Sequence, residues 1–188
     1  NRMLLLRTLA DALNRGRYQD QQIAVLFVDL DRLKDVNDNA GHDVGDLLLA
    51  SIASRLASAT RPADVIARIG GDEFVVMCEG GIDEQTSVEV AERVSHALSG
   101  KLMLNGVEVD LSVSIGIALS HPSLPMTGTP GDEALALLRN ADTAMYRAKA
   151  LGGGRHQIFD RVTVFAHTMF HGRIVTRGLR SRPRRRRP

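Results

Sequence analysis

Two short acidic segments stand where the sequence pattern places the ends of strands. Asp29-Leu30-Asp31 follows the apolar run Ile23–Val28, and Asp72-Glu73 lies between the apolar runs 65–69 and 74–77. Carboxylates at strand ends of an α/β sheet lie where ligands commonly bind. Hard oxygen ligands of this kind suit Mg²⁺, which takes one or two carboxylates together with substrate phosphates. Each segment alone is also compatible with ordinary solvated turn residues, because short acidic motifs are common.

A dense polar segment connects Asp31 to Asp46. Lys34 could meet a phosphate as a point charge, and Asn37 and Asp46 could hydrogen-bond the edge of a base. Backbone amides in the turn after Asp31 could add an anion-binding nest. A purely structural explanation stays open: acids in a first helical turn favour the helix dipole, Asn37-Asp38 suits a turn, and His42 alone is an ordinary surface histidine.

Hydrophobic periodicity predicts the elements that position these residues. Apolar residues at helical spacing predict helices over 2–14, 41–60, 84–98 and 132–151, with Asp43 as the N-cap of the second. Short β-branched runs predict strands over 23–28, 65–69, 74–77, 102–104, 107–119 and 157–159. Gly70-Gly71 and Asn105-Gly106 predict hairpin turns with positive φ, and 122–131 is expected to be a loop. Hairpins inside an alternating pattern indicate an α/β sandwich with a mixed sheet.

Length and composition limit the protein class. The chain has 188 residues, of which 44% are hydrophobic and 4% aromatic, which excludes a disordered protein and suits one domain. Its one cysteine, Cys78, excludes a disulfide scaffold and indicates a reduced, cytoplasmic setting. The longest apolar runs are too short for a bilayer span or a signal peptide, so we expect a soluble domain. A longer parent chain could still be anchored at the inner face of the cell membrane.

The formal charge of +2 conceals an uneven distribution. Eight of the 24 basic residues lie between Arg173 and Arg187, and no acidic residue follows Asp160. The first 172 residues therefore carry 16 basic and 22 acidic groups, a net charge of −6. Nucleic-acid binding argued from the sequence pI near 9.0 would concern the tail alone.

Four spaced motifs resemble those of one family. Gly70 to Phe74 reads GGDEF, and DLDRLKDVNDNAGHDVGD over 29–46 resembles the segment D-x-D-x-F-K-x-x-N-D-x-x-G-H-x-x-G-D, with Leu33 in place of Phe. SVSIGIA over 112–118 and ADTAMYRAKALG over 141–152 match two further signatures. The chain thus resembles a GGDEF-domain diguanylate cyclase over residues 1 to about 160. The resemblance implies a nucleotidyl-cyclase or polymerase-palm-like fold: a central mixed five-stranded sheet flanked by helices, with an added hairpin.

The resemblance also implies a reaction and its residues. Members condense two GTP into cyclic di-GMP and two pyrophosphates, at the interface of a homodimer of GGDEF domains. Asp29, the carbonyl of Leu30, Asp72 and Glu73 would hold Mg²⁺, with Mn²⁺ as a substitute, and Asp72 or Glu73 would be the general base. GTP would be bound by a set of residues that reads guanine and holds the triphosphate: Arg32, Leu33, Lys34, Asn37, His42, Asp46, Lys149 and Arg155.

Two local features bear on affinity and regulation. Gly153 stands where the family often has a phosphate-binding arginine, which weakens the case for tight triphosphate binding. Arg61-Pro62-Ala63-Asp64 is an R-x-x-D, separated from Gly70 by five residues. In this family that spacing marks a site where cyclic di-GMP inhibits the enzyme, although an isolated R-x-x-D is otherwise an ordinary surface ion pair.

Three hypotheses follow, in order of preference. The first is an active diguanylate cyclase domain, residues 1–160, from a larger protein with an upstream sensory domain and a possible downstream one. The second is a catalytically silent GGDEF module that binds GTP or cyclic di-GMP and regulates a neighbouring domain. The third is nucleic-acid binding by residues 161–188, which we instead expect to be a disordered basic tail or an added extension, because aromatic residues for base stacking are scarce.

Overall fold

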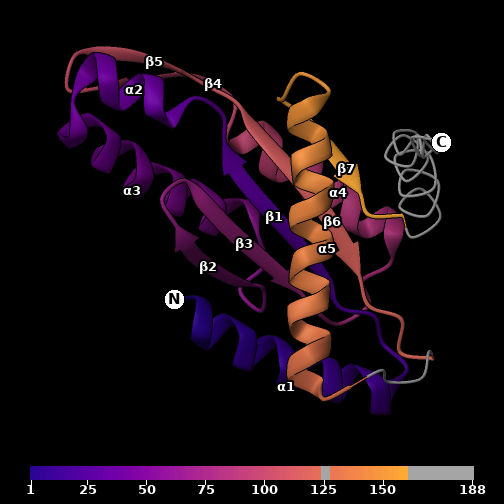
Figure 1. Ribbon diagram of the computed structural model, residues 1–188. Helices are drawn as coiled ribbons and strands as arrows, with labels where there is room; N and C mark the ends of the chain where they lie inside the picture. Colours follow the sequence, from indigo (N-terminus) through magenta and orange to yellow (C-terminus); the bar gives the residue numbers. More distant parts are fainter. Residues whose placement is uncertain (124–127, 161–188) are drawn as a thin grey trace, which may run out of the picture.

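A five-stranded sheet organises the chain (Figure 1). The computed structural model describes residues 1–123 and 128–160. The helices are α1 Arg2–Gln19, α2 Leu33–Ala40, α3 His42–Ala59, α4 Glu84–Ala97 and α5 Pro130–Ala150. The strands are β1 Ala24–Leu30, β2 Val65–Gly70, β3 Glu73–Cys78, β4 Gly100–Leu104, β5 Val107–Leu111, β6 Val113–Leu119 and β7 His156–Ile158. The sheet order is β2-β3-β1-β6-β7, and β4-β5 form a separate hairpin. The predicted mixed sheet with an added hairpin is confirmed.

Strand β1 lies at the centre of the sheet and is buried along its whole length. It pairs antiparallel with β3 on one side and with β6 on the other. Only β7 runs parallel to its neighbour, β6, and it forms the edge of the sheet. A strand buried on both faces needs apolar residues throughout, which is why Ala24–Val28 shows no alternation. The pairing with both neighbours therefore fixes the position of the carboxyl end of β1.

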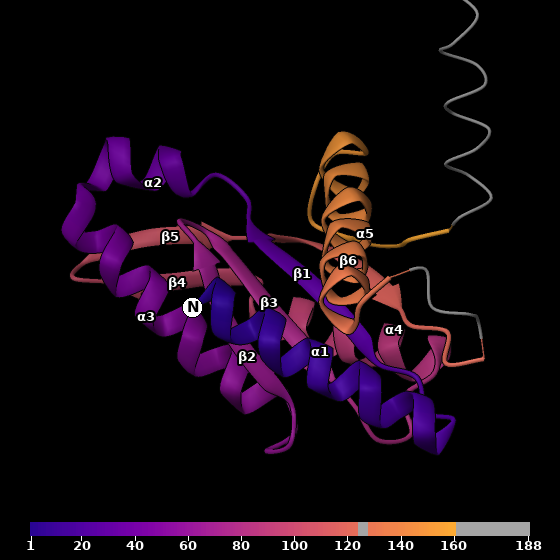
Figure 2. The same ribbon diagram turned by 60° about the horizontal axis from the view of Figure 1, so that its bottom comes forward.

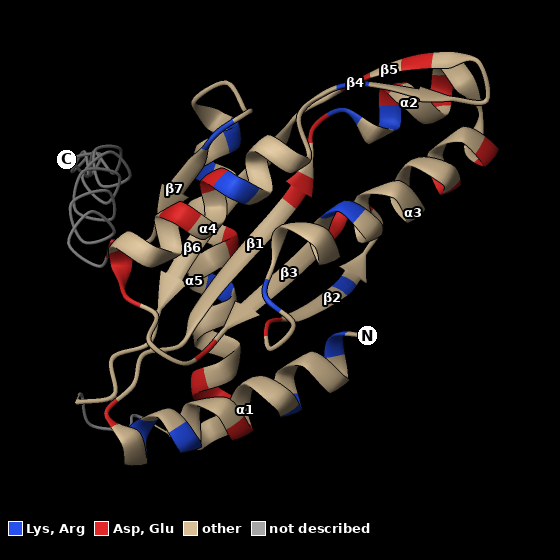
Figure 3. Cartoon of the chain, turned by 180° about the vertical axis from the view of Figure 1, so that it is seen from behind, with Lys and Arg blue, Asp and Glu red and all other residues tan. Residues whose placement is uncertain are grey.

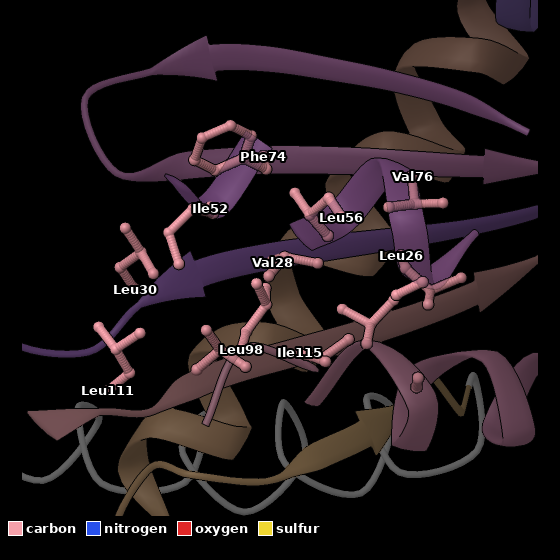
Figure 4. Packing of buried hydrophobic residues seen from close by; sticks show 14 of the residues in the cluster. Leu26, Val28, Leu30, Ile52, Leu56, Phe74, Val76, Leu98, Leu111 and Ile115 are labelled. Atoms are coloured by element: carbon pink, nitrogen blue, oxygen red, sulfur yellow. The ribbon is translucent and has the colours of Figure 1, made fainter. Parts of the chain in front are cut away.

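Helices cover both faces of the sheet (Figure 2). Helices α3 and α4 pack on one face, where Leu26, Val28 and Leu30 of β1 meet Ile52 and Leu56 of α3 (Figure 4). Helices α1 and α5 pack on the other face, against the intervening residues of β1 and β3. Successive residues of one strand thus feed two separate cores, as the alternation of side chains along a strand requires.

Helix α5 sits unusually close to β6. A Cβ atom placed on Gly116 would lie 2.0 Å from the carbonyl oxygen of Ala141 and 2.2 Å from the amide of Met145. Both neighbours are backbone atoms, so neither can swing aside. Gly116 therefore sets the distance between α5 and the sheet, and with it the position of Lys149 near the end of the helix.

Several local predictions are corrected by the structure. Strand β1 continues to Leu30 rather than ending at Val28, because β3 and β6 pair with it up to its last residues. The polar segment after Asp31 contains a helix, α2, that the apolar periodicity missed because only Leu33 is buried on it. Asp43 is not the N-cap of α3: Gly41 precedes the helix, and no side chain caps it.

The hairpin turns also differ from one another. Asn105 and Gly106 have φ of 48° and 82°, as predicted. Gly70 and Gly71 do not have positive φ, contrary to the prediction, since a register shift between Arg68 and Gly70 shapes this turn instead. The predicted strand over 107–119 is two strands, β5 and β6, which lie in different sheets on either side of Ser112.

The remaining boundaries shift by small amounts. Helix α5 begins at Pro130, because Thr129 and Asp132 form a capping box. Residues 124–127 of the expected loop and the whole of 161–188 fall outside the described residues, so the division of the chain at residue 160 stays a prediction. No helix within 1–123 or 128–160 has the length and apolarity required to cross a membrane.

Candidate active site

The two acidic segments meet at the carboxyl end of β1. Asp29 lies opposite Glu73 in the register of β1 and β3. The amide of Leu30 donates a hydrogen bond to the carbonyl oxygen of Asp72, at 3.3 Å, so the hairpin tip is tied to the end of the strand. Figure 3 shows acidic colouring at this end of β1 and basic residues on the segment that leads to α2. Residues that are 43 positions apart in the sequence are thereby brought to one place.

Asp29 is a buried carboxylate with an altered titration. The residue is only 5% exposed, and its pKa is raised from 3.8 to about 6, chiefly by burial. That value already includes the contact with Lys149, which opposes the rise in pKa, and the negative charges of Asp72 and Glu73, which contribute to it. Nζ of Lys149, reaching over from α5, lies 2.5 Å from Oδ1 of Asp29. The site therefore gathers the negative charges of Asp29, Asp72 and Glu73, and the positive charge of Lys149 compensates part of them.

The same carboxylate fits a divalent cation. Oδ1 of Asp29 is buried and is held by the ion pair with Lys149, with no other hydrogen-bond donor among the described residues. A buried carboxylate needs a compensating positive charge, which here is the Lys149 ammonium and which a divalent cation would supply equally well. Within residues 1–123 and 128–160, no three His, Cys, Asp or Glu side chains converge into a ready-made cage. A cation here would therefore need backbone and phosphate oxygens as well, which is the coordination that Mg²⁺ adopts with nucleotides.

Asp31 has a different environment from Asp29. Its carboxylate accepts hydrogen bonds from the hydroxyls of Ser112 at 2.7 Å and Ser114 at 2.8 Å, and from the amide of Gly154 at 3.0 Å. These donors belong to the start of β6 and to the turn after α5. Asp31 therefore fastens that turn to the end of β1, and it is a structural member of the acidic segment rather than a free ligand.

The turn after α5 explains the glycine at position 153. Gly153 has φ of +70°, and a Cβ there would lie 3.2 to 3.3 Å from the carboxylate of Asp31. A larger residue would be strained in this conformation and crowded by Asp31. Arg155 is exposed, and its Nε donates a hydrogen bond to the carbonyl oxygen of Gly153 at 3.2 Å. The arginine common at position 153 is thus absent, and Arg155 lies two residues further on.

The predicted nucleotide-binding residues cluster on α2 and the start of α3. Arg32, with φ of 65°, makes the turn from β1, and the buried Leu33 anchors α2. Lys34, His42 and Asp46 are exposed, whereas the half-buried side chain of Asn37 lies against Gly45 of α3. None of these four side chains makes a hydrogen bond to the described residues. A hollow of about 440 Å³ lies between α3 and the β2-β3 hairpin, lined by a set that includes Asp46, Arg68 and Phe74. Two larger hollows lie at the opposite end of β1, away from Asp29.

The R-x-x-D segment forms a turn between α3 and β2. Oδ2 of Asp64 accepts a hydrogen bond from the amide of Arg61 at 2.8 Å, and the amide of Asp64 donates to the carbonyl oxygen of Arg61 at 2.9 Å. Sequence reasoning missed Arg93 of α4, whose Nε donates to the carbonyl oxygen of Ala59 at 2.6 Å. The charges of Asp64, Arg61 and Arg93 all act on the pKa of the buried Cys78, so the three groups lie in the neighbourhood of that residue. A helical periodicity gives no signal for such a contact.

A family model described as diguanylate cyclase, GGDEF domain, matches residues 1–155. The chain belongs to the GGDEF family. The bifunctional diguanylate cyclase/cyclic di-GMP phosphodiesterase MucR of Pseudomonas aeruginosa is 41% identical over 160 residues, which cover 85% of this chain and 22% of MucR.

Solved structures agree with the family assignment. The GGDEF domain of YfiN, or TpbB, from Pseudomonas aeruginosa has a TM-score of 0.76 and 36% identity, covering 85% of this chain and 96% of that one. The GGDEF domain of DgcB from Caulobacter crescentus, in complex with c-di-GMP, has a TM-score of 0.71 at 23% identity, covering 81% and 86%, and shows the same fold. The chain spans about a fifth to a third of the length of the curated relatives it matches.

Proposed function

We propose that this GGDEF domain is a diguanylate cyclase that condenses two GTP into cyclic di-GMP and two pyrophosphates, with Mg²⁺ as the natural metal and Mn²⁺ as a substitute. The observation that carries the proposal is the buried Oδ1 of Asp29, which among the described residues is paired with Lys149 alone and belongs to the strand position opposite Glu73, beside the hairpin that bears Asp72 and Glu73. A two-carboxylate metal site beside exposed nucleotide-binding side chains is what phosphoryl transfer requires.

The residues divide into metal ligands and triphosphate ligands. Asp29, the carbonyl of Leu30, Asp72 and Glu73 would hold the metal, which when bound polarises the α-phosphate and makes the 3′-hydroxyl more acidic. Lys149 would move from Asp29 to the triphosphate as the cation takes over its carboxylate partner. Arg155, Lys34 and the amides of Arg32 and Leu33 would hold the remaining phosphate oxygens.

The chemical step is a displacement at phosphorus. The 3′-oxygen of one GTP forms a bond to the α-phosphorus of the other, the bond from that phosphorus to the bridging oxygen breaks, and pyrophosphate leaves. Asp72 or Glu73 would accept the proton of the hydroxyl. Because each domain holds one GTP, two domains must face each other, and a homodimer completes the site. Repetition of the step with the roles exchanged closes the ring.

Guanine recognition would rest on Asn37 and Asp46, with His42 close by. A carboxylate can accept from N1–H and N2–H₂ of guanine, and adenine offers no such pair of donors. A mismatched base would leave these polar groups unpaired, which is why sites of this kind discriminate strongly.

Product inhibition would act through the turn at Arg61 and Asp64. Two arginines and a carboxylate around one point suit a guanine, since guanidinium groups can donate to O6 and N7 and a carboxylate can accept from N1–H and N2–H₂. The structure adds Arg93 of α4 to the pair chosen from the sequence. We therefore propose cyclic di-GMP as both product and inhibitor.

A silent GGDEF module is the alternative, and Gly153 is the observation that favours it. Without the usual arginine the triphosphate site has one cation fewer, and an arginine placed at position 153 would be strained at φ of +70° and crowded by Asp31. Such a module would bind GTP or cyclic di-GMP and regulate a neighbouring domain. An upstream sensory domain, and a downstream domain in the longer protein, would be its partners; we propose a cytoplasmic location, where GTP is available, and do not propose nucleic-acid binding.

Product analysis separates the two functions. The domain is incubated with GTP and Mg²⁺ over a wide range of protein concentration, and the products are separated by chromatography. Formation of cyclic di-GMP that rises more steeply than protein concentration supports a cyclase that works as a dimer. GTP binding without product at any concentration, with Mn²⁺ as well as Mg²⁺, supports the silent module.

Inhibition is tested with Arg61→Ala and a matched control. Cyclic di-GMP should inhibit the wild type, and the Arg61→Ala and Arg93→Ala variants should each need at least about tenfold more of it, since a charge-assisted hydrogen bond is worth that much. Arg139→Ala, at an exposed position of α5 on the opposite face of the sheet, should leave inhibition unchanged. An Arg61→Ala enzyme that stays fully inhibited would sink this part of the proposal.

A further inference from the structure

Gly45 occupies a helical position that does not call for glycine. It is the fourth residue of α3, it is buried, and its φ is in the ordinary helical range. Among the residues that a helix accepts, glycine is the least favourable except for proline. The glycine at this position is therefore explained by space rather than by backbone conformation.

The space it leaves is filled by Asn37. A Cβ atom at position 45 would lie 1.9 Å from Oδ1 of Asn37, 3.0 Å from its Cγ and 3.6 Å from its Nδ2. The side chain of Asn37, which comes from α2, thus rests directly on the backbone of α3. Any residue larger than glycine would force the whole amide group of Asn37 to rotate away.

Nothing else in the described protein holds that amide in place. The side chain of Asn37 makes no hydrogen bond among the described residues, and it is only half-buried. Asp46 follows Gly45 directly and is exposed at the same helix start. The packing of Asn37 on Gly45 therefore sets the position of one polar group relative to the other.

We propose that Gly45 is a positioning residue for base recognition, which seats the Asn37 amide beside the Asp46 carboxylate so that both meet one guanine. The inference rests on the proposed binding of GTP. Gly45 touches no substrate atom and acts through Asn37 alone. A methyl group at position 45 should therefore weaken binding of GTP while leaving the metal and triphosphate residues undisturbed.

A double-mutant cycle in stability tests the geometric step without any nucleotide. Alanine at position 45 improves helix propensity, and in the Asn37→Ala background, where the amide is gone, Gly45→Ala should raise Tm by about 2–4 °C. In the wild-type background the rise should be smaller, because the new methyl group must displace the Asn37 amide from its packing on α3. Ala57→Gly, at an exposed position of the same helix, is the control and should lower Tm equally in both backgrounds. An equal rise from Gly45→Ala in both backgrounds overturns the inference.

Equilibrium binding tests the functional step. A non-hydrolysable GTP analogue and the matching ATP analogue are titrated into the full chain with Mg²⁺. Gly45→Ala should weaken GTP-analogue binding about tenfold, the loss of roughly one hydrogen bond, and should narrow the preference over ATP. Added to Asn37→Ala it should have no further effect. If Gly45→Ala and Asn37→Ala weaken GTP-analogue binding additively, the role proposed for Gly45 is wrong, while the proposed function stands. If the wild type binds no GTP analogue, both the proposed function and the role of Gly45 are wrong.

Discussion

Replacement of Asp29 by asparagine should stabilise the metal-free domain at neutral pH. Asp29 has a pKa of about 6, raised first by burial and then by the charges of Asp72 and Glu73, and opposed by Lys149. Compared with 3.8 in the unfolded chain, this rise corresponds to about 3 kcal/mol, at about 1.4 kcal/mol for each pKa unit. The favourable contact with Lys149 is already included in that figure.

The net gain from Asp29→Asn is smaller than the full figure. The amide of asparagine at this 5% exposed position still needs partners, and an unsatisfied buried polar group costs about 1–2 kcal/mol. We therefore expect a gain of about 1–2 kcal/mol in the free energy of unfolding, which is several degrees in Tm for a domain of this size. Thermal and urea unfolding in the presence of EDTA measure it.

The pH dependence gives the sign of the effect. Between about pH 4 and pH 6 the folded wild type binds more protons than the unfolded chain, because the pKa of Asp29 is higher in the folded state. Wild-type stability should therefore fall relative to the Asp29→Asn variant as pH rises through this window, and the difference should be constant above it. Asp142→Asn, at an exposed position of α5, should show no such difference.

Added metal should reverse the order of stability. Mg²⁺ that binds the folded wild type stabilises it by about 2.7 kcal/mol at one hundred times the dissociation constant, and the Asp29→Asn variant should gain little. If the variant is instead less stable than the wild type at pH 7 in EDTA, and the gap does not widen toward pH 4, the charge of Asp29 does not destabilise the fold. In that case the reasoning from burial is wrong.

Three further predictions concern the frame around the site. Asp31→Ala should lower the free energy of unfolding by at least about 2–3 kcal/mol in urea titrations, because the fully buried hydroxyl of Ser114 loses its acceptor and the turn after α5 loses its attachment to β1. Hydrogen exchange at the amide of Gly154 should become faster. Exchange as slow as in the wild type would refute the role of Asp31 in holding this turn. Gly116→Ala should destabilise the domain by about 1–3 kcal/mol or more, since its Cβ meets backbone of α5, and a neutral effect would contradict the close packing. Cys78 should not react with iodoacetamide at pH 8 until the protein unfolds, since burial raises its pKa to about 12, and rapid native labelling would oppose this.

Sequence patterns were sufficient for elements that bury a regular stripe. The apolar run of β1, the periodic faces of α3 and α5, and the turn at Asn105-Gly106 were all predicted from spacing alone. These features depend on local periodicity and turn chemistry, which a linear sequence records. Helix α2 was not predicted, because its one buried residue, Leu33, cannot produce a hydrophobic periodicity.

The motifs also placed the candidate site residues near one another in a way that periodicity cannot. Their spacing identified the family, and the family assigned roles to Asp29, Asp72, Asn37 and Asp46. The roles themselves stay predictions, since they depend on ligands and on a second domain. The amino-acid sequence by itself determined only which residue types stand at the ends of the strands and helices.

Tertiary structure decided what each acidic residue is available to do. Asp29 and Asp31 are two positions apart and chemically identical, yet one is a buried acceptor beside Lys149 and the other accepts three hydrogen bonds from β6 and the turn after α5. Side chains two residues apart share a strand face only while the strand lasts, and β1 ends at Leu30 between them. The partners come from residues more than 80 positions away, so only the packing of α5 and β6 against β1 separates a candidate metal ligand from a structural anchor.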